Sequence, residues 1–448
     1  MPHKWLSITK GDLAIEREQC LDEGRDFTGV QKEYDTLLKT DLDNDPTLQP
    51  RAGAFLDATI ALPVQKDYQF REPSDLAGIR AERPDGPRRI NISLPDDVLF
   101  DNVLGAWLGR CAGCLLGKPV EGWRTERMWG YLKDLGRFPL ADYFHSDIPE
   151  AVAKKYDVKG GAFINNVNRM VEDDDTNYTV TGFVLMKQKG AGFTPDDMAD
   201  FWMQNIPLLH TCTAERVAYK NFSVGITAPA SAAYRNVYRE WIGAQIRADF
   251  FGYAAMGYPE LAADFAFRDA SISHVKNGIY GEMWVAAMLA AAPFERDVMN
   301  VIRTGLSEIP AKSRLARDIE TVIGWHAEGI GYAEAISRIH TQWNEKNGHH
   351  WCHTNSNAMI VALGLLWGEG DFEKSVCRAV EACLDTDCNG ATVGSVVGMM
   401  LGAKALPSKW IAPLNDTLDT GIAGYHRVSI SAIAKEGFDV YRAVRERA

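Results

Sequence analysis

The stretch from 105 to 121 reads GAWLGRCAGCLLGKPVE, and its glycines stand four residues apart, at 105, 109, 113 and 117. The same spacing recurs at 390, 394, 398 and 402. Residues four apart share one face of an α-helix, so each set predicts a helix with a smooth ridge. Glycine costs about 1 kcal/mol relative to alanine inside a helix, or roughly 3 to 4 kcal/mol per helix, which close backbone approach would offset. Both helices are therefore expected to be central, either as separately crowded core helices or in contact with each other.

Helical periodicity continues through most of the chain, whereas alternation of period two is scarce. The pattern predicts helices at 97–117, 176–189, 249–267, 281–293, 313–327, 353–368 and 388–404. No repeat of 20 to 50 residues of the solenoid kind accompanies it. We predict an all-α fold with a dozen or so helices.

The first 95 residues differ in character from the rest. A charged helical pattern around Gly11–Thr40 is followed by a polar break at Asp41–Pro50. The segment 71–95 is rich in proline, glycine and charge, which is typical of an extended strap or linker. We predict an amino-terminal helical extension with a strap-like linker over 1–95, and a main helical domain over 96–448.

Composition narrows the function classes. The net charge of −12 argues against nucleic acid as a stable partner, because binding to polyphosphate usually needs a basic surface. No secretory leader and no uncharged apolar window of membrane-spanning length occurs, so we expect a cytoplasmic protein without a membrane partner. The eight cysteines are scattered, which disfavours a disulfide framework. Cys111 and Cys114 form a lone C-x-x-C that is either redox-active, zinc-binding or, as we favour, a pair of buried thiols.

Two acidic clusters stand at predicted helix starts. EDDDT occupies 172–176, and DTDC occupies 385–388, directly before the second glycine-ridged helix. Carboxylates are favoured at helix amino-termini by the helix dipole and as caps, which explains either cluster alone. Hard divalent cations such as Mg²⁺ and Mn²⁺ prefer oxygen ligands, and two distant clusters can close one site. Together the clusters predict a metal site.

Other residues offer chemistry with plainer alternatives. Glu121 follows the helix that Pro119 ends, and is either a general acid or base or an exposed helix-end glutamate. The group His349, His350, Cys352 and His353 has ligand types that favour zinc, but it leads into a helix and is interpreted as a loop and cap. The aromatic residues Trp107, Trp123, Trp129, Tyr131, Tyr143 and Phe144 form either a face for an adenine base or part of the core.

Five motifs in this order resemble the ADP-ribosylglycohydrolase family, which includes ADP-ribosyl-acceptor hydrolases and dinitrogenase reductase-activating glycohydrolase. They are GAWLGRCAGCLLGKPVE, EDDDT, GAQIRAD at 243–249, SISHVKNG at 271–278 and DTDCNGATVGSVVG at 385–398. The resemblance runs from about Asp96 to Pro407. It implies a compact orthogonal multi-helix bundle with two Mg²⁺ or Mn²⁺ ions between the two acidic motifs.

The resemblance also assigns roles to residues. It implies metal ligands at Asp173, Asp174, Asp175, Asp385, Asp387 and Cys388, catalytic residues at Glu121 and Asp174, and substrate-binding residues at Gly243, Gln245, Arg247, His274 and Gly278. For Arg247, a buried salt bridge is an equal alternative to a phosphate-facing role. For His274, the equal alternative is a buried histidine with its hydrogen bonds satisfied.

The chain departs from the family pattern at three places. Cys114 stands where the family has aspartate, Cys388 stands where it has a ligating serine or threonine, and Ala244 with Gln245 replaces a glycine–alanine pair. A thiol is a poor ligand for Mg²⁺, so position 388 is expected either to leave its place to water or to suit a softer metal.

The expected reaction is hydrolysis at the anomeric carbon of an ADP-ribosyl group, with an ADP-ribosylated or other ribosylated molecule as substrate. Two alternatives stay open: hydrolysis of a smaller ribosyl compound, such as a nucleoside or nucleotide conjugate, and a non-catalytic relative that only binds its ligand.

Overall fold

The computed structural model describes residues 4–447, and its secondary structure is almost wholly helical. The amino-terminal part contains α1 (Lys10–Asp22), α2 (Gln31–Leu38), α3 (Gln49–Ile60) and α4 (Leu76–Glu82). The remainder contains α5 (Asp96–Gly117), α6 (Thr125–Asp134), α7 (Glu150–Lys155), α8 (Asp174–Lys189), α9 (Pro195–Asn205), α10 (Thr213–Ser223), α11 (Ala230–Ala233), α12 (Asp249–Ala254), α13 (Pro259–Ala270), α14 (Asn277–Ala291), α15 (Val298–Leu306), α16 (Arg314–Ala327), α17 (Tyr332–Gln342), α18 (Gly348–Cys352), α19 (Thr354–Gly368), α20 (Phe372–Glu381), α21 (Thr386–Leu401), α22 (Ser408–Ile411) and α23 (Ile430–Arg445).

Two short strands, β1 (Thr417–Asp419) and β2 (Arg427–Ser429), pair antiparallel with Leu418 opposite Val428. They are the only named sheet between residues 4 and 447. The all-α prediction is therefore confirmed. Within the same residues, none of the helices combines the length and apolar character needed to span a bilayer.

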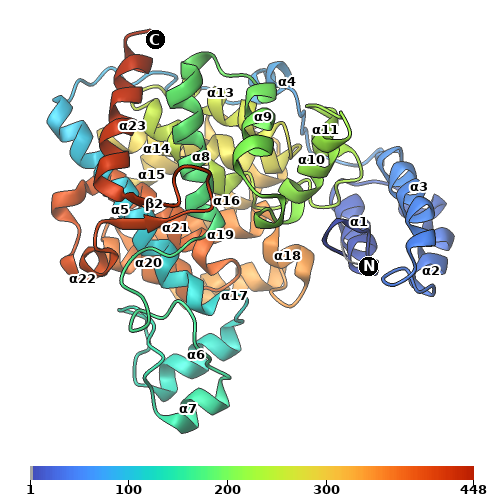
Figure 1. Cartoon of the computed structure of the whole chain (residues 1–448), viewed down its shortest axis with the longest axis horizontal. Coiled ribbons are helices and arrows are strands. Elements are labelled where there is room, and N and C mark those ends of the chain that lie inside the picture. Colours follow the sequence, from blue (N-terminus) through green and yellow to red (C-terminus); the bar gives the residue numbers. More distant parts are fainter. Residues whose placement is uncertain (1–3, 448) are drawn as a thin grey trace.

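Helices α5 and α21 pack against each other along their glycines, at the centre of the molecule (Figure 1). The partners run antiparallel: Gly105 meets Gly398, Gly109 meets Gly394, and Gly113 meets Gly390. A Cβ atom added at any of these glycines would lie closer than 3.0 Å to the backbone of the opposite helix. Of the two alternatives, separately crowded core helices and helices in contact, the structure shows the second, and the backbones approach as closely as the absence of side chains permits.

The same contact sets the position of the helix ends. Gly117, the last residue of α5, lies against the backbone of Thr386 and Asp387 at the start of α21, and the Thr386 hydroxyl donates to the Gly117 carbonyl over 2.9 Å. The carboxyl end of α5 and the amino end of α21 are thereby joined. Glu121 follows α5 after the 3₁₀ turn η4 (Lys118–Val120).

Each predicted helix is observed, with two corrections. The expected dozen or so helices are exceeded by the 23 α-helices of residues 4–447, because helices as short as α11 and α22 are too short to show a 3.6-residue period. The segment 249–267 forms two helices, α12 and α13, rather than one. Gly257 between them has a left-handed backbone with φ +84°, which a helix cannot continue through, and Pro259 opens α13, where its missing N–H group leaves no hydrogen bond unmade.

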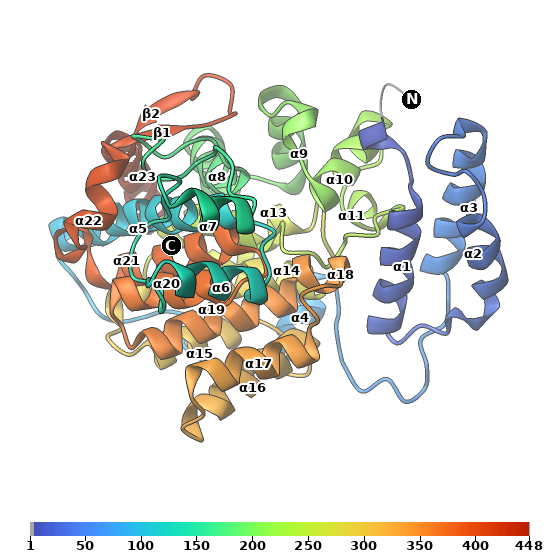
Figure 2. The ribbon, with the colours of Figure 1, turned by 90° about the horizontal axis from the view of Figure 1, so that it is seen from below.

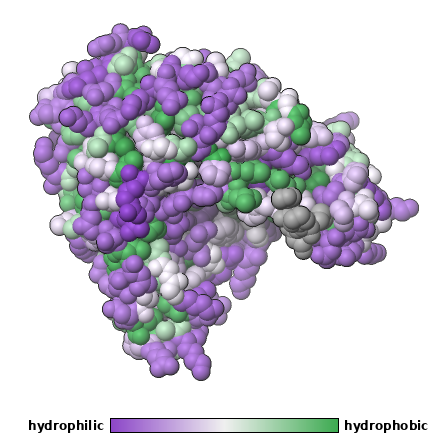
Figure 3. Space-filling view, in the orientation of Figure 1, coloured by the Kyte–Doolittle hydropathy of each residue, from purple (hydrophilic) through white to green (hydrophobic). Residues whose placement is uncertain are grey.

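The amino-terminal helices α1, α2 and α3 stand together at one side of the molecule, and both views place them beside α10 and α11 (Figures 1 and 2). Figure 3 shows a largely hydrophilic face, indented between this group and the α6–α7 projection.

Buried ion pairs hold the extension to the rest of the chain. Arg239 is almost completely buried and binds Glu16 over 2.6 Å and Glu23 over 2.9 Å, both from the extension. Glu72 likewise binds the buried Arg314 over 2.9 Å. Removing one partner from such a pair leaves a buried charge uncompensated, which typically costs about 3 to 5 kcal/mol. The extension is therefore held in place by carboxylates that neutralise the buried Arg239 and Arg314 of the rest of the chain.

The predicted strap over 71–95 is extended for most of its length but contains the short helix α4, which the sequence analysis missed. Asp75 caps this helix by accepting from the Gly78 amide over 2.8 Å. Arg83, just after α4, binds Glu308 and Glu260 over 2.5 Å each. The strap therefore lies fastened along the main domain.

Substituting Gly109 by alanine should destabilise the protein by about 2 to 4 kcal/mol, because the new methyl group would overlap the Gly394 carbonyl and force α5 and α21 apart. The matched control is Gly324→Ala in α16, where an added Cβ meets nothing within 4 Å and should stabilise by about 1 kcal/mol. Urea unfolding curves measure both. Equal effects of the two substitutions would contradict the close backbone contact.

Candidate metal centre

The first acidic cluster forms the start of α8. Asp173 is its N-cap: its Oδ1 accepts from the Asp175 amide over 2.9 Å, and its Oδ2 binds the Lys118 ammonium group over 2.5 Å. Asp174 and Asp175 occupy the first turn, where the helix dipole favours negative charge. Asp175 is completely buried, and Asp174 is partly exposed.

Arg110 of α5 anchors Asp175. Its guanidinium group donates to the Asp175 carbonyl over 2.8 Å, lies 3.3 Å from Asp175 Oδ1, and pairs with Asp249 over 2.8 Å. It also donates to the Ile246 carbonyl over 2.6 Å. One arginine of the central helix therefore fixes both the start of α8 and the 243–249 segment.

The second cluster forms the start of α21. Asp385 is the N-cap, and its amide donates to Asn357 Oδ1 over 3.1 Å. Cys383 and Leu384, directly before it, both have left-handed backbones, with φ +64° and +61°. Non-glycine residues in this region cost about 1 to 3 kcal/mol each, and such strain clusters at functional sites. Here it turns the chain sharply into α21 and brings Asp385 to the helix mouth.

Ligand atoms from the two helix starts and from Glu121 converge in two overlapping groups. In one, carboxylate oxygens of Glu121, Asp385 and Asp387 lie within 4.8 Å of one another. In the other, oxygens of Asp175 and Asp387 and the Cys388 sulfur do the same. Asp387 belongs to both. A third group joins Cys114, Asp173 and Asp175 on the α5 side.

The carboxyl groups strongly perturb one another. Burial, then the charges of Asp173 and Asp387, raise the pKa of Asp174 to about 8. Burial is also the main reason that the pKa values of Asp175, Asp385 and Asp387 lie well above the ordinary range, with neighbouring carboxylates adding to it.

Asp173 and Glu121 behave differently from that buried set. Burial would raise the pKa of Asp173, but the Lys118 ammonium group beside it holds the pKa below its usual value. Glu121 stands at the exposed rim, yet loss of hydration around its carboxyl group, with the charges of Asp173 and Asp174, raises its pKa to about 7.

The residues fit a divalent cation. Among residues 4–447, Asp175 Oδ2 and Asp387 Oδ1 are buried without any hydrogen-bond partner, although buried carboxylate oxygens normally have one. Arg110 and Lys118 are the basic side chains paired with these clusters, and they bind Asp175 Oδ1 and Asp173 respectively. The bare oxygens of Asp175 and Asp387 therefore have the chemistry that a cation satisfies.

The residues expected to bind substrate lie in the interior. Arg247 binds Glu215 and Asp269 over 2.5 Å each and is 1% exposed. Its guanidinium group therefore forms buried salt bridges, as in the alternative to a phosphate-facing role. His274 is buried with Nδ1 2.8 Å from the Ser273 hydroxyl, and burial lowers its pKa well below the usual value. Gln245 is also fully buried.

The two glycines of that set lie where a side chain would not fit. A Cβ at Gly243 would overlap the Glu215 carboxylate, and one at Gly278 would overlap the Arg239 carbonyl. Of the expected site residues, the structure thus brings together the six of the acidic clusters with Glu121. The 243–278 residues lie in a buried network around Arg247 that borders these clusters, since the charge of Glu215 contributes to the raised pKa of Asp174.

Sequence reasoning missed the residues that position the carboxylates. Arg110 was visible as a charged residue within an apolar helical run, and Lys118 as a cation between the central helix and Glu121. Asn357 carried no such signal, yet its side-chain oxygen accepts from both the Asp385 amide and Asn389. The aromatic residues of the first helix and its surroundings, with Trp107 and Tyr131 fully buried, belong to the core.

The family model described as ADP-ribosylglycohydrolase matches residues 95–446, well over half of the chain. The chain belongs to the ADP-ribosylglycohydrolase family. A solved structure of an ADP-ribosylglycohydrolase-related protein complex is similar over 78% of this chain and 99% of that one, with 18% identity and a TM-score of 0.47. A comparison with curated proteins gave no match.

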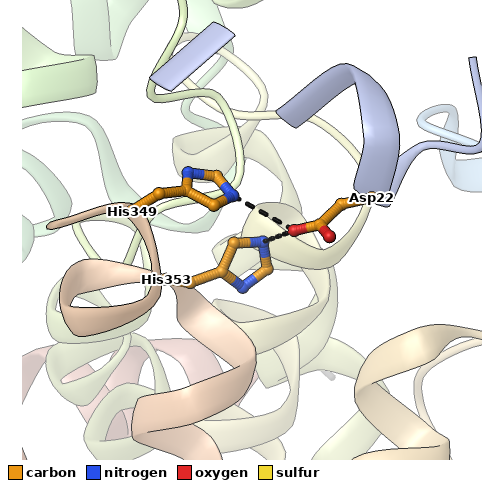
Figure 4. Close-up of side chains that lie close together, drawn as sticks. All are labelled: Asp22, His349 and His353. Atoms are coloured by element: carbon orange, nitrogen blue, oxygen red, sulfur yellow. Dashed lines mark hydrogen bonds and ion pairs between the residues drawn. The ribbon is translucent and has the colours of Figure 1, made fainter. Parts of the chain in front are cut away.

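Another group with metal-ligand residue types lies outside these acidic clusters. Asp22 at the end of α1 meets His349 of α18 and His353, the N-cap of α19 (Figure 4). Asp22 Oδ2 is 3.1 Å from His349 Nε2 and 3.9 Å from His353 Nε2. The group joins the extension to the loop that carries Cys352.

The hydrogen bonds on the far side of each ring argue against a metal there. His349 Nδ1 accepts from the Trp241 indole over 2.9 Å, and His353 Nδ1 accepts from the Asn355 amide over 3.1 Å. Both donors can only donate, so in the neutral rings the proton sits on Nε2, which then has no lone pair for a metal. Ligating histidines normally donate through the other nitrogen. His349 Nε2–H instead donates to the Asp22 carboxylate, whereas His353 Nε2 is buried without a hydrogen-bond partner among the described residues. The cap role expected of this segment is confirmed for His353.

Burial lowers the pKa of His353 well below its usual 6.5. The folded protein therefore keeps this ring neutral while the unfolded chain takes up a proton below pH 6.5, so stability should fall on acidification, by at most about 1.4 kcal/mol per pH unit. His353→Asn retains a capping side chain and removes the titration. The urea concentration at the midpoint of unfolding should fall less between about pH 7 and about pH 5.5 in His353→Asn than in the unsubstituted protein. Parallel pH dependences would show that His353 is not held neutral.

Proposed function

We propose that this chain is a hydrolase that uses two divalent cations, Mg²⁺ or Mn²⁺, to cleave the glycosidic bond at the anomeric carbon of an ADP-ribosyl group. The supporting observation is the pair of overlapping ligand groups that share Asp387, because a shared carboxylate between two sets of ligands is the arrangement that holds two adjacent ions. Membership in a glycohydrolase family supports the same chemistry.

Divalent cations supply Lewis-acid chemistry at such a centre: they withdraw electron density from substrate oxygen atoms and lower the pKa of water. Asp175, Asp385 and Asp387 would hold them, with Asp174 at the more open side of the α8 start. As the leaving group departs, positive charge develops on the ribose ring. The buried carboxylates stabilise that charge, since they are already fixed and poorly hydrated.

Glu121 is suited to move a proton. It stands at the rim, with a carboxylate oxygen within 4.8 Å of Asp385 and Asp387 oxygens, so its carboxyl group lies beside the position where a cation would hold the substrate. As an acid it would protonate the leaving group, and as a base it would take a proton from the attacking water. A pocket of about 350 Å³, lined by Lys118, Glu121, Trp123 and Arg127 among others, opens beside it and gives the reaction a route to solvent.

A specific observation also favours the second candidate, hydrolysis of a smaller ribosyl compound. Gln245, Arg247 and His274 are fully or almost fully buried, and Arg247 is neutralised by carboxylates. This network offers no free guanidinium group to a pyrophosphate. A nucleoside or nucleotide conjugate would need only the carboxylate centre and the pocket beside Glu121.

Calorimetric titration of ADP-ribose into metal-stripped protein and into protein reloaded with Mg²⁺ or Mn²⁺ tests the proposal. Binding should require metal, and Asp387→Asn should weaken it more than tenfold by removing the shared ligand. The matched control is Asp371→Asn, since Asp371 caps α20 away from the centre and asparagine caps equally well. Metal-loaded protein that binds a nucleoside monophosphate but not ADP-ribose would move the assignment to the smaller substrate. Full metal and ligand binding by Asp387→Asn would overturn the centre itself.

A further inference from the structure

Two cysteine sulfurs lie inside the acidic centre. The Cys388 sulfur, in the first turn of α21, is within 4.8 Å of carboxylate oxygens of Asp175 and Asp387. The Cys114 sulfur, on α5, is within the same distance of oxygens of Asp173 and Asp175. Both side chains are buried. The glycine contact between α5 and α21 brings both sulfurs beside Asp175, although the two cysteines are 274 positions apart in the chain (388 − 114).

These sulfurs divide the centre into two chemically different positions. The group of Glu121, Asp385 and Asp387 contains oxygen ligands only, which suits a hard cation such as Mg²⁺ or Mn²⁺. The group of Asp175, Asp387 and Cys388 contains two carboxylates and one sulfur. Thiolate is a poor ligand for Mg²⁺ and a good one for Zn²⁺, which accepts sulfur and carboxylate oxygen together.

The surroundings of Cys388 are not those of an ordinary buried thiol. Buried cysteines usually replace small apolar side chains and lie among apolar neighbours. Cys388 lies among carboxylates, and both residues that complete its group have a buried oxygen without a hydrogen-bond partner, Asp175 Oδ2 and Asp387 Oδ1. A polar cavity wall with bare carboxylate oxygens and one sulfur is what a thiophilic cation would satisfy.

Lys118 adds to the asymmetry. Its ammonium group binds Asp173 over 2.5 Å, and the other oxygen of Asp173 caps α8, so both oxygens of this carboxylate are already engaged. Asp173 is therefore the least available of the expected oxygen ligands. On that side of the centre Asp175 and the two sulfurs remain.

We infer that the position formed by Asp175, Asp387 and Cys388 takes a thiophilic divalent cation, Zn²⁺, while the all-oxygen position takes Mg²⁺ or Mn²⁺. This rests on the metal centre of the proposed function and deepens it. On binding, the Cys388 S–H bond breaks, a sulfur–zinc bond forms, and the proton leaves to solvent. Cys114 belongs to the neighbouring group with Asp173 and Asp175 and is not a ligand of this position.

Cobalt is the probe, because thiolate–Co²⁺ bonds give an intense near-ultraviolet absorption that oxygen ligands do not. Full-length, metal-stripped protein titrated with Co²⁺ should develop this band, and excess Zn²⁺, but not excess Mg²⁺, should bleach it. Cys388→Ser should lose the band while still binding cobalt at the all-oxygen position. Cys111→Ser is the matched control: Cys111 is a buried α5 cysteine outside the ligand groups, and its variant should keep the band.

A measurement on the unsubstituted protein covers the case in which Cys388→Ser does not fold. X-ray absorption at the zinc edge should show a sulfur neighbour at about 2.3 Å. Cobalt or zinc bound with oxygen and nitrogen neighbours only would overturn the inference, and if ADP-ribose still bound with Mg²⁺ or Mn²⁺ the proposed function would stand. Elemental analysis that finds no metal retained under any loading would overturn both.

Discussion

The contact between the backbones of α5 and α21 is the constraint on which the site depends. Each helix gives up side chains along one ridge, and the loss of helix propensity is offset by an approach that no larger residue permits. The antiparallel register then fixes what lies at the ends. Gly117 meets Thr386 and Asp387, so the chain that continues to Glu121 emerges beside the start of α21. The close packing of the two helices therefore determines which acidic side chains lie next to each other.

The buried charges form a second layer of the same construction. The side chain of Arg110 in α5 pairs with Asp175 and Asp249, and Lys118 pairs with Asp173. These two cations fix the positions of the carboxylates but satisfy only part of their oxygen atoms. Burying the remaining negative charge is unfavourable in the absence of a counter-ion, which is why the pKa values of Asp174 and its neighbours are raised. A site built this way gains stability when a cation enters it.

Sequence patterns predicted the parts of this arrangement that are local. Glycine spacing predicted the two central helices, and carboxylates before helical segments predicted the acidic helix starts, because both signals depend on residues within one or two turns. Patterns gave no signal where distant partners decide. The family resemblance implied substrate binding at Gln245 and Arg247, which stays a prediction, and no pattern indicated that Glu215 and Asp269, remote in sequence, enclose Arg247. The docking of the extension through Arg239, and the left-handed turn at Cys383 and Leu384, likewise left no local pattern.

If the starts of α8 and α21 form one cation centre, crystals of the full chain grown with Mn²⁺ should show it by anomalous diffraction. We expect anomalous density within about 2.0 to 2.6 Å of carboxylate oxygens of Asp387 and of at least one of Asp175 and Asp385. Anomalous density only at the Asp22, His349 and His353 group would contradict a shared centre. So would the absence of density if the Asp175 and Asp387 carboxylates accepted hydrogen bonds from protein donors instead.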